Sequence, residues 1–229
     1  MKLDVIYLDN HLLTVNKPPG LLAQADDTGD PDLVTLAKYF LKKKFSKPGN
    51  VFAGLVHRLD RPVSGVMVLA RTSKAASRLS VQFRDHLPQK RYLAVVEGDC
   101  EGEGVCRNHL VKKNQRVRVT APATPSARYA ELAWKAVAWK SGLSLVDVLL
   151  KTGRPHQIRV QLSHLGFPIL GDFRYGAKRE LDGKNMALHC YCLSLAHPVR
   201  DEKMKWVARP PRSWAGRFGD EIEYIINEG

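Results

Sequence analysis

Short apolar runs separated by turn residues constrain the fold of this chain more than any other feature of its sequence. Most runs are bounded by Gly, Pro, Asn, Asp or Ser and have the length and residue types of β-strands. They occupy residues 3–8, 12–16, 51–56, 65–70, 90–96, 129–139, 143–151 and 186–195. The pair 129–139 and 143–151 reads as a hairpin that turns at Ser141-Gly142. Strands interspersed with a few helices predict an α+β fold with a mainly antiparallel sheet.

Helical spacing is confined to three segments. Asp32 is placed to cap a helix over residues 33–44, whose last turn carries three lysines. A second helix is expected from a Ser73 cap to about His86. A third is expected to begin at Pro155 and run to Leu165, because proline suits the first helical position. Residues 198–219 are expected to form an irregular tail rich in Pro, Arg and Trp.

Length and terminal composition limit the class of protein. The 229 residues suit one large domain or two subdomains that share a core. No apolar run approaches the roughly 20 residues of a membrane-spanning helix. The first ten residues, MKLDVIYLDN, lack the apolar core and cleavage site of a secretory signal. We therefore expect a cytoplasmic protein with no membrane partner.

Positive charge is concentrated in the middle of the chain. The formal net charge is +13, whereas residues 1–40 and 219–229 are both net negative, so residues 41–218 carry about +20. A segregated basic body is the footprint of a polyanion binder such as an RNA-binding protein. Charge alone also fits a soluble basic protein with no such partner.

The four cysteines do not form a recognisable metal motif. Five residues separate Cys100 from Cys106, and one residue separates Cys190 from Cys192, which differs from the usual spacings of zinc ligands. We expect reduced, partly buried thiols and no metal site.

A single acid stands out in a cationic stretch. Between residues 41 and 84 the chain has ten Lys or Arg and one carboxylate, Asp60, which lies between Arg58 and Arg61 in the segment 57–65. A carboxylate among cations stays ionised and can act as a nucleophile or stabilise positive charge. A structural ion pair that holds a turn would explain the same pattern.

The segment 151–162 is the second place where the residues indicate chemistry. On the expected helix, Ile158, Leu162 and Leu165 share one face, and His156 and Arg159 lie on another. One side would then be buried while Arg159 faces a site, and the helix N-terminus near Arg154 would attract phosphate. A basic helix with a solvated face is the simpler alternative.

These two segments resemble the H-R-L-D-x-x-T-S-G and G-R-x-H-Q-I-R-x-H motifs of the RluA family of RNA pseudouridine synthases. Between them, residues 90–94 (KRYLA) resemble the family's K-x-Y-x-A motif. Residues 15–20 (VNKPPG) and 168–172 (PILGD) match further family segments in the same order. The resemblance runs from about residue 4 to residue 214, which is nearly the whole chain.

The resemblance implies a fold and an activity. The fold would be a mixed, mainly antiparallel sheet in two halves, about 1–110 and 111–229, with flanking helices and an RNA cleft between the halves. The chain would be a single catalytic domain without the small RNA-binding module often fused to such enzymes, and we expect it to be a monomer. The activity would be isomerisation of specific uridines in structured tRNA or rRNA, with no cofactor and no metal.

The resemblance also assigns roles to individual residues. Asp60 would be the catalytic carboxylate, Tyr92 would stack on the extruded base, and Arg159 would pair with Asp60 and keep it ionised. The residues expected to contact the RNA are Arg58, Arg61, Lys90, Arg154 and His156.

Two positions depart from the motifs. Val63 stands where the family has Thr, and Gln161 where it has the last His of the second motif. They keep a second hypothesis open, a non-catalytic RNA-binding or ribosome-assembly protein that retains the fold.

Overall fold

The chain forms two compact units, each built from segments that are far apart in the sequence. The computed structural model describes residues 2–114, 116–183 and 185–228. The first unit comprises residues 1–88 and 191–209, and the second comprises residues 89–190 and 210–229. The units therefore interleave along the chain, whereas the sequence-based division at residue 110 is linear.

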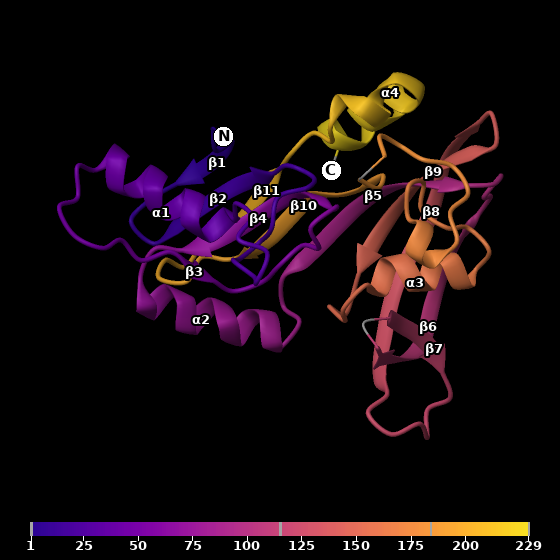
Figure 1. The fold of residues 1–229 in the computed structure, drawn as a ribbon, viewed down its shortest axis with the longest axis horizontal. Helices are drawn as coiled ribbons and strands as arrows, with labels where there is room; N and C mark the ends of the chain where they lie inside the picture. The colour runs from indigo at the N-terminus through magenta and orange to yellow at the C-terminus, as the bar shows by residue number, and fades with distance from the viewer. Residues whose placement is uncertain (1, 115, 184, 229) are drawn as a thin grey trace. The chain divides into compact units, whose positions relative to one another are not determined.

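The first unit is a sheet with two helices. Its strands run in the order β1-β2-β4-β10, with β3 paired to β4 and β11 paired to β10. The pairs β1–β2, β2–β4, β3–β4 and β10–β11 are antiparallel. The elements are β1 (Val5–Leu8), β2 (Leu12–Lys17), α1 (Leu33–Lys44), β3 (Gly54–Leu55), β4 (Ser64–Ala70), α2 (Ser73–Arg84), β10 (Leu188–Ala196) and β11 (Lys203–Val207) (Figure 1).

The second unit contains a sheet in the order β5-β9-β8-β6-β7, in which each of these neighbouring pairs is antiparallel. Strand β7 lies at its edge. Residues 188–190 of β10 belong to this unit and precede β5 in the strand order. The remaining elements are β5 (Gln89–Glu97), β6 (Glu103–Lys113), β7 (Arg116–Thr120), β8 (Arg128–Lys140), β9 (Leu143–Leu150), α3 (Gln157–His164), η1 (Phe173–Tyr175) and α4 (Arg212–Glu228) (Figure 1).

Strand register assigns α3 and α4 to different faces of this sheet. Tyr92 lies opposite Val148, and Val148 lies opposite Trp134, so their side chains share one face. The same face carries Leu110, Val117 and Ala130, and Val160 of α3 packs into that cluster. Val95 is three residues from Tyr92 and faces the other way, where it lines a hollow with Trp214 and Phe218 of α4. Helix α3 thus covers the face that carries Tyr92.

Several sequence predictions are confirmed. Helix α1 has the predicted bounds, and the Asp32 carboxylate caps it by accepting a hydrogen bond from the Thr35 amide at 3.0 Å. The hairpin β8–β9 turns at Ser141 and Gly142, both with positive φ. The mainly antiparallel α+β architecture is confirmed as well. Among the described residues, no helix is long and apolar enough to cross a membrane.

Other predictions are wrong. The cap of α2 is Thr72 rather than Ser73, because the Thr72 hydroxyl accepts the Ala75 amide at 3.1 Å. The expected irregular tail contains β11 and the first part of α4, whose backbone has a kink at Phe218. In β11 the buried Met204 and Trp206 alternate with exposed lysines, but a five-residue alternation is too short to be distinguished from a loop by pattern alone.

Candidate active site

Asp60 lies in a tight turn of the first unit that is tied to the Pro-Gly loop after β2. The Val63 amide donates to the Asp60 carbonyl at 3.0 Å and closes the turn. The Gly20 amide donates to the Arg61 carbonyl at 2.8 Å, and Arg61 Nε donates back to the Gly20 carbonyl at 3.1 Å. These reciprocal bonds hold the backbone directly after Asp60.

Lys17, at the end of β2, is a fully buried cation beside this turn. Its ammonium donates to the carbonyls of Pro18 at 3.0 Å, Leu21 at 2.8 Å and Arg61 at 3.2 Å. Burial lowers the pKa of Lys17 to about 7, and the negative charge of Asp60 opposes this shift. Lys17 therefore braces the Asp60 turn and is coupled to its charge. Sequence reasoning did not assign it a role, although a lone lysine in an apolar strand before Pro-Pro-Gly is a usable signal.

Arg159 of α3 is buried and held by a carboxylate that sequence reasoning did not select. Arg159 Nε donates to Asp172 Oδ2 at 2.7 Å, and Nη2 donates to Asp172 Oδ1 at 2.8 Å. Asp172 is 1% exposed and Arg159 is 6% exposed. A bidentate, charge-assisted pair fixes the plane of the guanidinium. The predicted pairing of Arg159 with Asp60 stays a prediction, because the two residues belong to different units.

Tyr175 connects the surroundings of Arg159. Its ring lies under the guanidinium, with Arg159 Cζ 5.0 Å from the ring centre. Its hydroxyl lies 2.8 Å from His156 Nδ1 and accepts the Val117 amide of β7 at 3.1 Å. Burial raises the pKa of Tyr175, so the hydroxyl stays neutral. Helix α3, η1 and β7 are therefore joined around one aromatic side chain.

Helix α3 differs from its predicted form. It begins at Gln157 rather than at Pro155, and His156 precedes it in the left-handed conformation with φ 53°. Its residues 157–162 are all buried, including three polar ones, so the alternative of a basic helix with a solvated face is wrong. The Gln157 side chain accepts the Arg154 amide at 3.0 Å and the Thr152 hydroxyl at 2.7 Å.

Tyr92 and Lys90 lie on the sheet face that α3 covers. Both are on β5, two residues apart, and both are buried. Burial lowers the pKa of Lys90. A Cβ atom on Gly153, just before α3, would lie 3.5 Å from Lys90 Nζ. The structure thus brings Tyr92, Lys90 and the Arg159 helix to one face of the second unit.

The remaining predicted RNA contacts have different surroundings. Arg58 is exposed. Arg61 forms an ion pair with Asp30 at 2.8 Å, and Arg154 Nε donates to the Tyr129 carbonyl at 2.9 Å. Their contacts with RNA stay predictions. Because Lys90 is buried, it is the least suited of the set to reach a phosphate.

His57 and the four cysteines, all among the described residues, are packed into the structure and show no sign of a metal site. His57 Nε2 accepts the Val68 amide at 3.0 Å, and its ring stacks on Phe83 at 4.5 Å between centres. All four cysteines are buried and free of disulfide bonds, as the sequence predicts. Within the described ranges, no group of three His, Cys, Asp or Glu is arranged to hold a metal ion.

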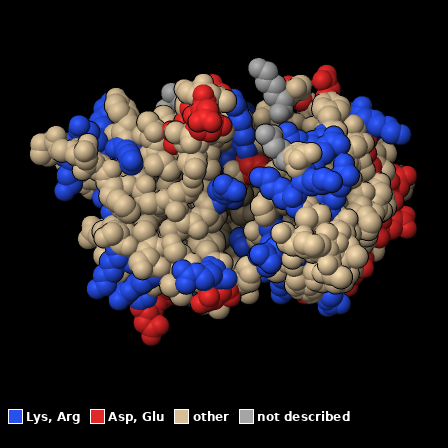
Figure 2. Space-filling view, turned by 60° about the horizontal axis from the view of Figure 1, so that its bottom comes forward, with Lys and Arg blue, Asp and Glu red and all other residues tan. Residues whose placement is uncertain are grey.

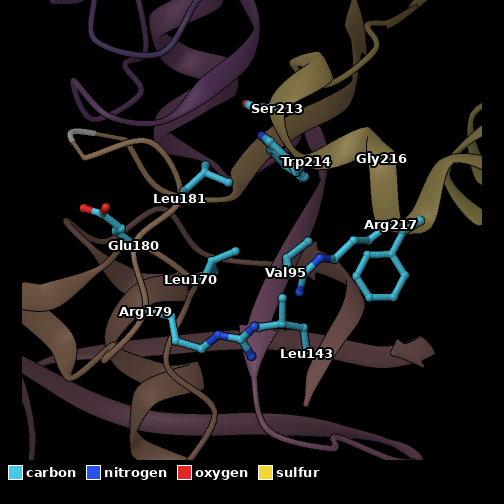
Figure 3. Close-up of a pocket in the computed structure, with 11 residues that line it drawn as sticks. Val95, Leu143, Leu170, Arg179, Glu180, Leu181, Ser213, Trp214, Gly216 and Arg217 are labelled. Atoms are coloured by element: carbon cyan, nitrogen blue, oxygen red, sulfur yellow. The ribbon is translucent and has the colours of Figure 1, made fainter. Parts of the chain in front are cut away.

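A hollow of about 300 Å³ lies on the other face of the second unit's sheet. Its lining includes Arg179 and Arg217 and the apolar residues Val95, Leu143 and Leu170 (Figure 3). The sheet separates this hollow from the side chain of Tyr92, so it takes no part in the candidate active site.

A family model described as RNA pseudouridylate synthase matches residues 11–164, which is more than half of the chain. The chain belongs to this family. It is 32% identical to ribosomal large subunit pseudouridine synthase D of Zymomonas mobilis, over 92% of this chain and 70% of that protein. It is also 32% identical to tRNA pseudouridine synthase C of Yersinia pestis, over 93% of this chain and 89% of that protein. The resemblance to the RluA family is confirmed.

Solved structures support the fold. The human protein RNA pseudouridylate synthase domain containing 4 aligns with a TM-score of 0.79 at 23% identity, over 96% of this chain and 93% of that one. The related human domain-containing protein 1 aligns with a TM-score of 0.72. The pseudouridine synthase fold is therefore confirmed. Together with the curated relatives, the family match identifies the chain as an RNA pseudouridine synthase, an isomerase that converts uridine to pseudouridine.

Proposed function

We propose that this chain modifies specific uridines in structured tRNA or rRNA, with Asp60, Tyr92 and Arg159 acting on the same nucleotide. The relatives named above include synthases named for ribosomal RNA and for tRNA, so both substrate classes are represented. The basic central body of the chain suits either polyanion. We further propose that the chain works as a monomer in the cytoplasm.

The observation that carries the assignment is the fixed Arg159 guanidinium on the sheet face of Tyr92. A purely RNA-binding arginine is normally exposed and mobile, whereas Arg159 is 6% exposed and held by Asp172 and Tyr175. Nε and Nη2 each donate one hydrogen bond to Asp172, which accounts for two of the five N–H donors of the guanidinium. Such an arrangement suits a group that must orient charge at a reacting centre.

The chemistry divides among the three residues. Isomerisation breaks the C1′–N1 bond of uridine, turns the base, forms a C1′–C5 bond and moves the C5 proton to the solvent while N1 gains one. Asp60 would attack the reacting nucleotide or stabilise positive charge on the sugar. Tyr92 would stack on the flipped uracil, and Arg159 would keep Asp60 ionised. Lys17 would act on Asp60 from within the first unit as a positioning residue.

The test is to incubate the protein with RNA from a strain that lacks the gene, followed by mass spectrometry of nucleosides after pseudouridine-specific derivatisation. The wild type should add pseudouridine at defined positions. Asp60→Asn keeps the shape of the side chain and removes its charge. It should lower turnover by about four orders of magnitude or more, as loss of a catalytic carboxylate does.

A matched control is Asp30→Asn, which removes an exposed carboxylate of the same unit that pairs with Arg61. Turnover of this variant should stay within a few-fold of the wild type. Appreciable turnover by Asp60→Asn would contradict the catalytic role and favour a structural ion pair. Absence of any wild-type product would favour a non-catalytic RNA-binding protein.

A further inference from the structure

A basic groove of about 430 Å³ runs along the open edge of β7 in the second unit. It is bordered by β7, by the C-terminal half of α3 and by η1. Figure 2 shows Lys and Arg side chains gathered on the surface of this unit, on the right of the view. We call this feature the β7 groove; its lining residues include Arg116, Arg118, Ser163, His164, Arg174 and Tyr175.

The charge of the groove is one-sided. Three arginines and a histidine line it, and its lining contains no Asp or Glu. Arg116 and Arg118 are exposed, and within the described part of the chain neither forms an ion pair. Arg116 and Arg118 alternate along β7 with Val117, which faces α3, so they approach the groove from the other face of this edge strand. Each of these two guanidinium groups can donate two parallel hydrogen bonds to an anion that lies at the strand edge.

The edge of β7 adds backbone donors. The Val117 amide points away from the sheet and donates to the Tyr175 hydroxyl at 3.1 Å. Residues two apart in a strand point the same way, so the Val119 amide is directed at the same open edge. A strand edge with outward N–H groups beside arginines is a suitable cradle for phosphate oxygens.

The groove is joined to the candidate active site through Tyr175. The Tyr175 ring lies under Arg159, its hydroxyl bonds β7, and the Ser163 hydroxyl donates to its carbonyl at 2.6 Å. Ser163 lies one helical turn after Arg159 on α3, so the groove continues from the part of α3 that carries Arg159.

We propose that the β7 groove binds backbone phosphates of the substrate RNA, in a stretch that flanks the target uridine. This inference rests on the proposed function, and it names a contact surface outside the sequence motifs. The arginine-lined edge of the groove offers positive charge and hydrogen-bond donors, and among the described residues it has no exposed aromatic ring on which a base could stack. It should therefore position the RNA without reading its sequence.

The test measures the salt dependence of RNA affinity for the full chain, with a stem–loop transcript that contains a modification site mapped in deletion-strain RNA. Arg116→Ala with Arg118→Ala should raise Kd about 20-fold near 0.15 M salt, if each arginine neutralises one phosphate. The slope of log affinity against log salt should fall by roughly one to two. Arg116→Lys with Arg118→Lys should keep most of the slope, because it keeps the charge.

The matched control is Lys74→Ala with Lys135→Ala, which removes the same charge from exposed positions outside the groove. Thermal denaturation of each variant checks that folding is intact. We call the Arg116→Ala, Arg118→Ala variant the groove pair and the Lys74→Ala, Lys135→Ala variant the control pair. If the groove pair had the same Kd and the same salt slope as the control pair, the proposal would be overturned.

Two further outcomes distinguish this inference from binding of a free anion and from the proposed catalytic activity. If the groove pair loses binding of tripolyphosphate, used as a small-anion probe, but keeps RNA affinity, the groove binds a free anion and the RNA proposal is wrong. If the wild type forms no pseudouridine while the groove pair loses RNA affinity, the proposed activity fails and the groove inference stands.

Discussion

The Asp172→Asn substitution would test whether the buried carboxylate holds Arg159 in its working orientation. The replacement is nearly isosteric, so it changes charge and hydrogen bonding with little change in packing. Its oxygen can still accept one N–H of Arg159, but its amide group would face the second donor. One charge-assisted bond is therefore lost, and Arg159, which is 6% exposed, stays buried without the negative charge of Asp172.

The size of the stability effect follows from that burial. Removing one partner of a buried ion pair costs about 3–5 kcal/mol, because the remaining charge is left desolvated. Asn retains one hydrogen bond, so we expect the lower end, about 3 kcal/mol. For a chain of this size that corresponds to a fall in Tm of roughly 6–12 °C.

The effect on catalysis should be separable from the effect on binding. Arg159 would lose its fixed plane, and a misplacement of about 1 Å at a reacting centre can cost on the order of 100-fold in rate. We expect single-turnover rates to fall about 10- to 100-fold at a temperature where the variant is folded, with RNA Kd changed less than about threefold. Nucleoside mass spectrometry of timed samples gives the rate, and filter binding gives Kd.

Asp147→Asn is the matched control for this prediction. Asp147 pairs with Arg91 in the same unit, but the Arg91 side chain is 45% exposed. The Asp147 side chain is 11% exposed, but its partner reaches solvent, so loss of the pair should cost about 1 kcal/mol and leave the rate unchanged. If Asp172→Asn altered Tm and rate no more than Asp147→Asn does, the positioning role of Asp172 would be refuted.

Three further predictions concern Arg159, Gly171 and Lys17. Arg159→Lys should reduce turnover strongly while RNA affinity stays near the wild-type value, because an ammonium cannot replace the bidentate guanidinium; kcat and Kd measured together would expose a neutral outcome. Gly171→Ala should destabilise the protein by more than the ~1–2 kcal/mol of left-handed strain, because its Cβ would clash with the Asn185 carbonyl. Gly176→Ala, also at positive φ but in open space, is the thermal-denaturation control. Lys17 has a pKa of about 7 in the folded protein and 10.5 as a free side chain, so between pH 7 and 10.5 only the unfolded chain holds the proton. The free energy of unfolding should therefore rise by up to ~1.4 kcal/mol per pH unit in this range. Denaturant unfolding of Lys17→Met should lack that rise.

The sequence predicted what depends on local signals. The Asp32 cap of α1, the turn of β8–β9 and most of the strand runs are encoded by neighbouring residues, and they are confirmed. The run 51–56 forms only the two-residue strand β3. The motif residues around Asp60 and Arg159 were found because their order along the chain is specific.

The partners of these residues were not predicted, because they come from distant parts of the chain. Asp172 lies 13 residues beyond Arg159, in a loop after α3, and no periodicity links the two. The spacing of α3 left a solvated face open as an alternative, yet Gln157, Arg159 and Gln161 are buried because each has a polar partner on another element. Helical periodicity separates apolar from polar residues and cannot show that a polar residue will be buried with a partner.

The two departures from the family motifs have structural explanations, and this bears on the non-catalytic alternative. Gln161 is fully buried, and its Nε2 donates to Asn108 Oδ1 at 2.8 Å and lies 3.3 Å from the Cys106 carbonyl, so it joins α3 to β6. Val63 is 3% exposed, where a hydroxyl would need a buried partner, and its amide still closes the Asp60 turn. Both departures therefore serve packing and bracing, while the charged group of Arg159 and the turn of Asp60 keep their supports. A protein that had abandoned catalysis would have no need of a desolvated Arg159–Asp172 pair, which stabilises a fold less than apolar residues of the same volume would.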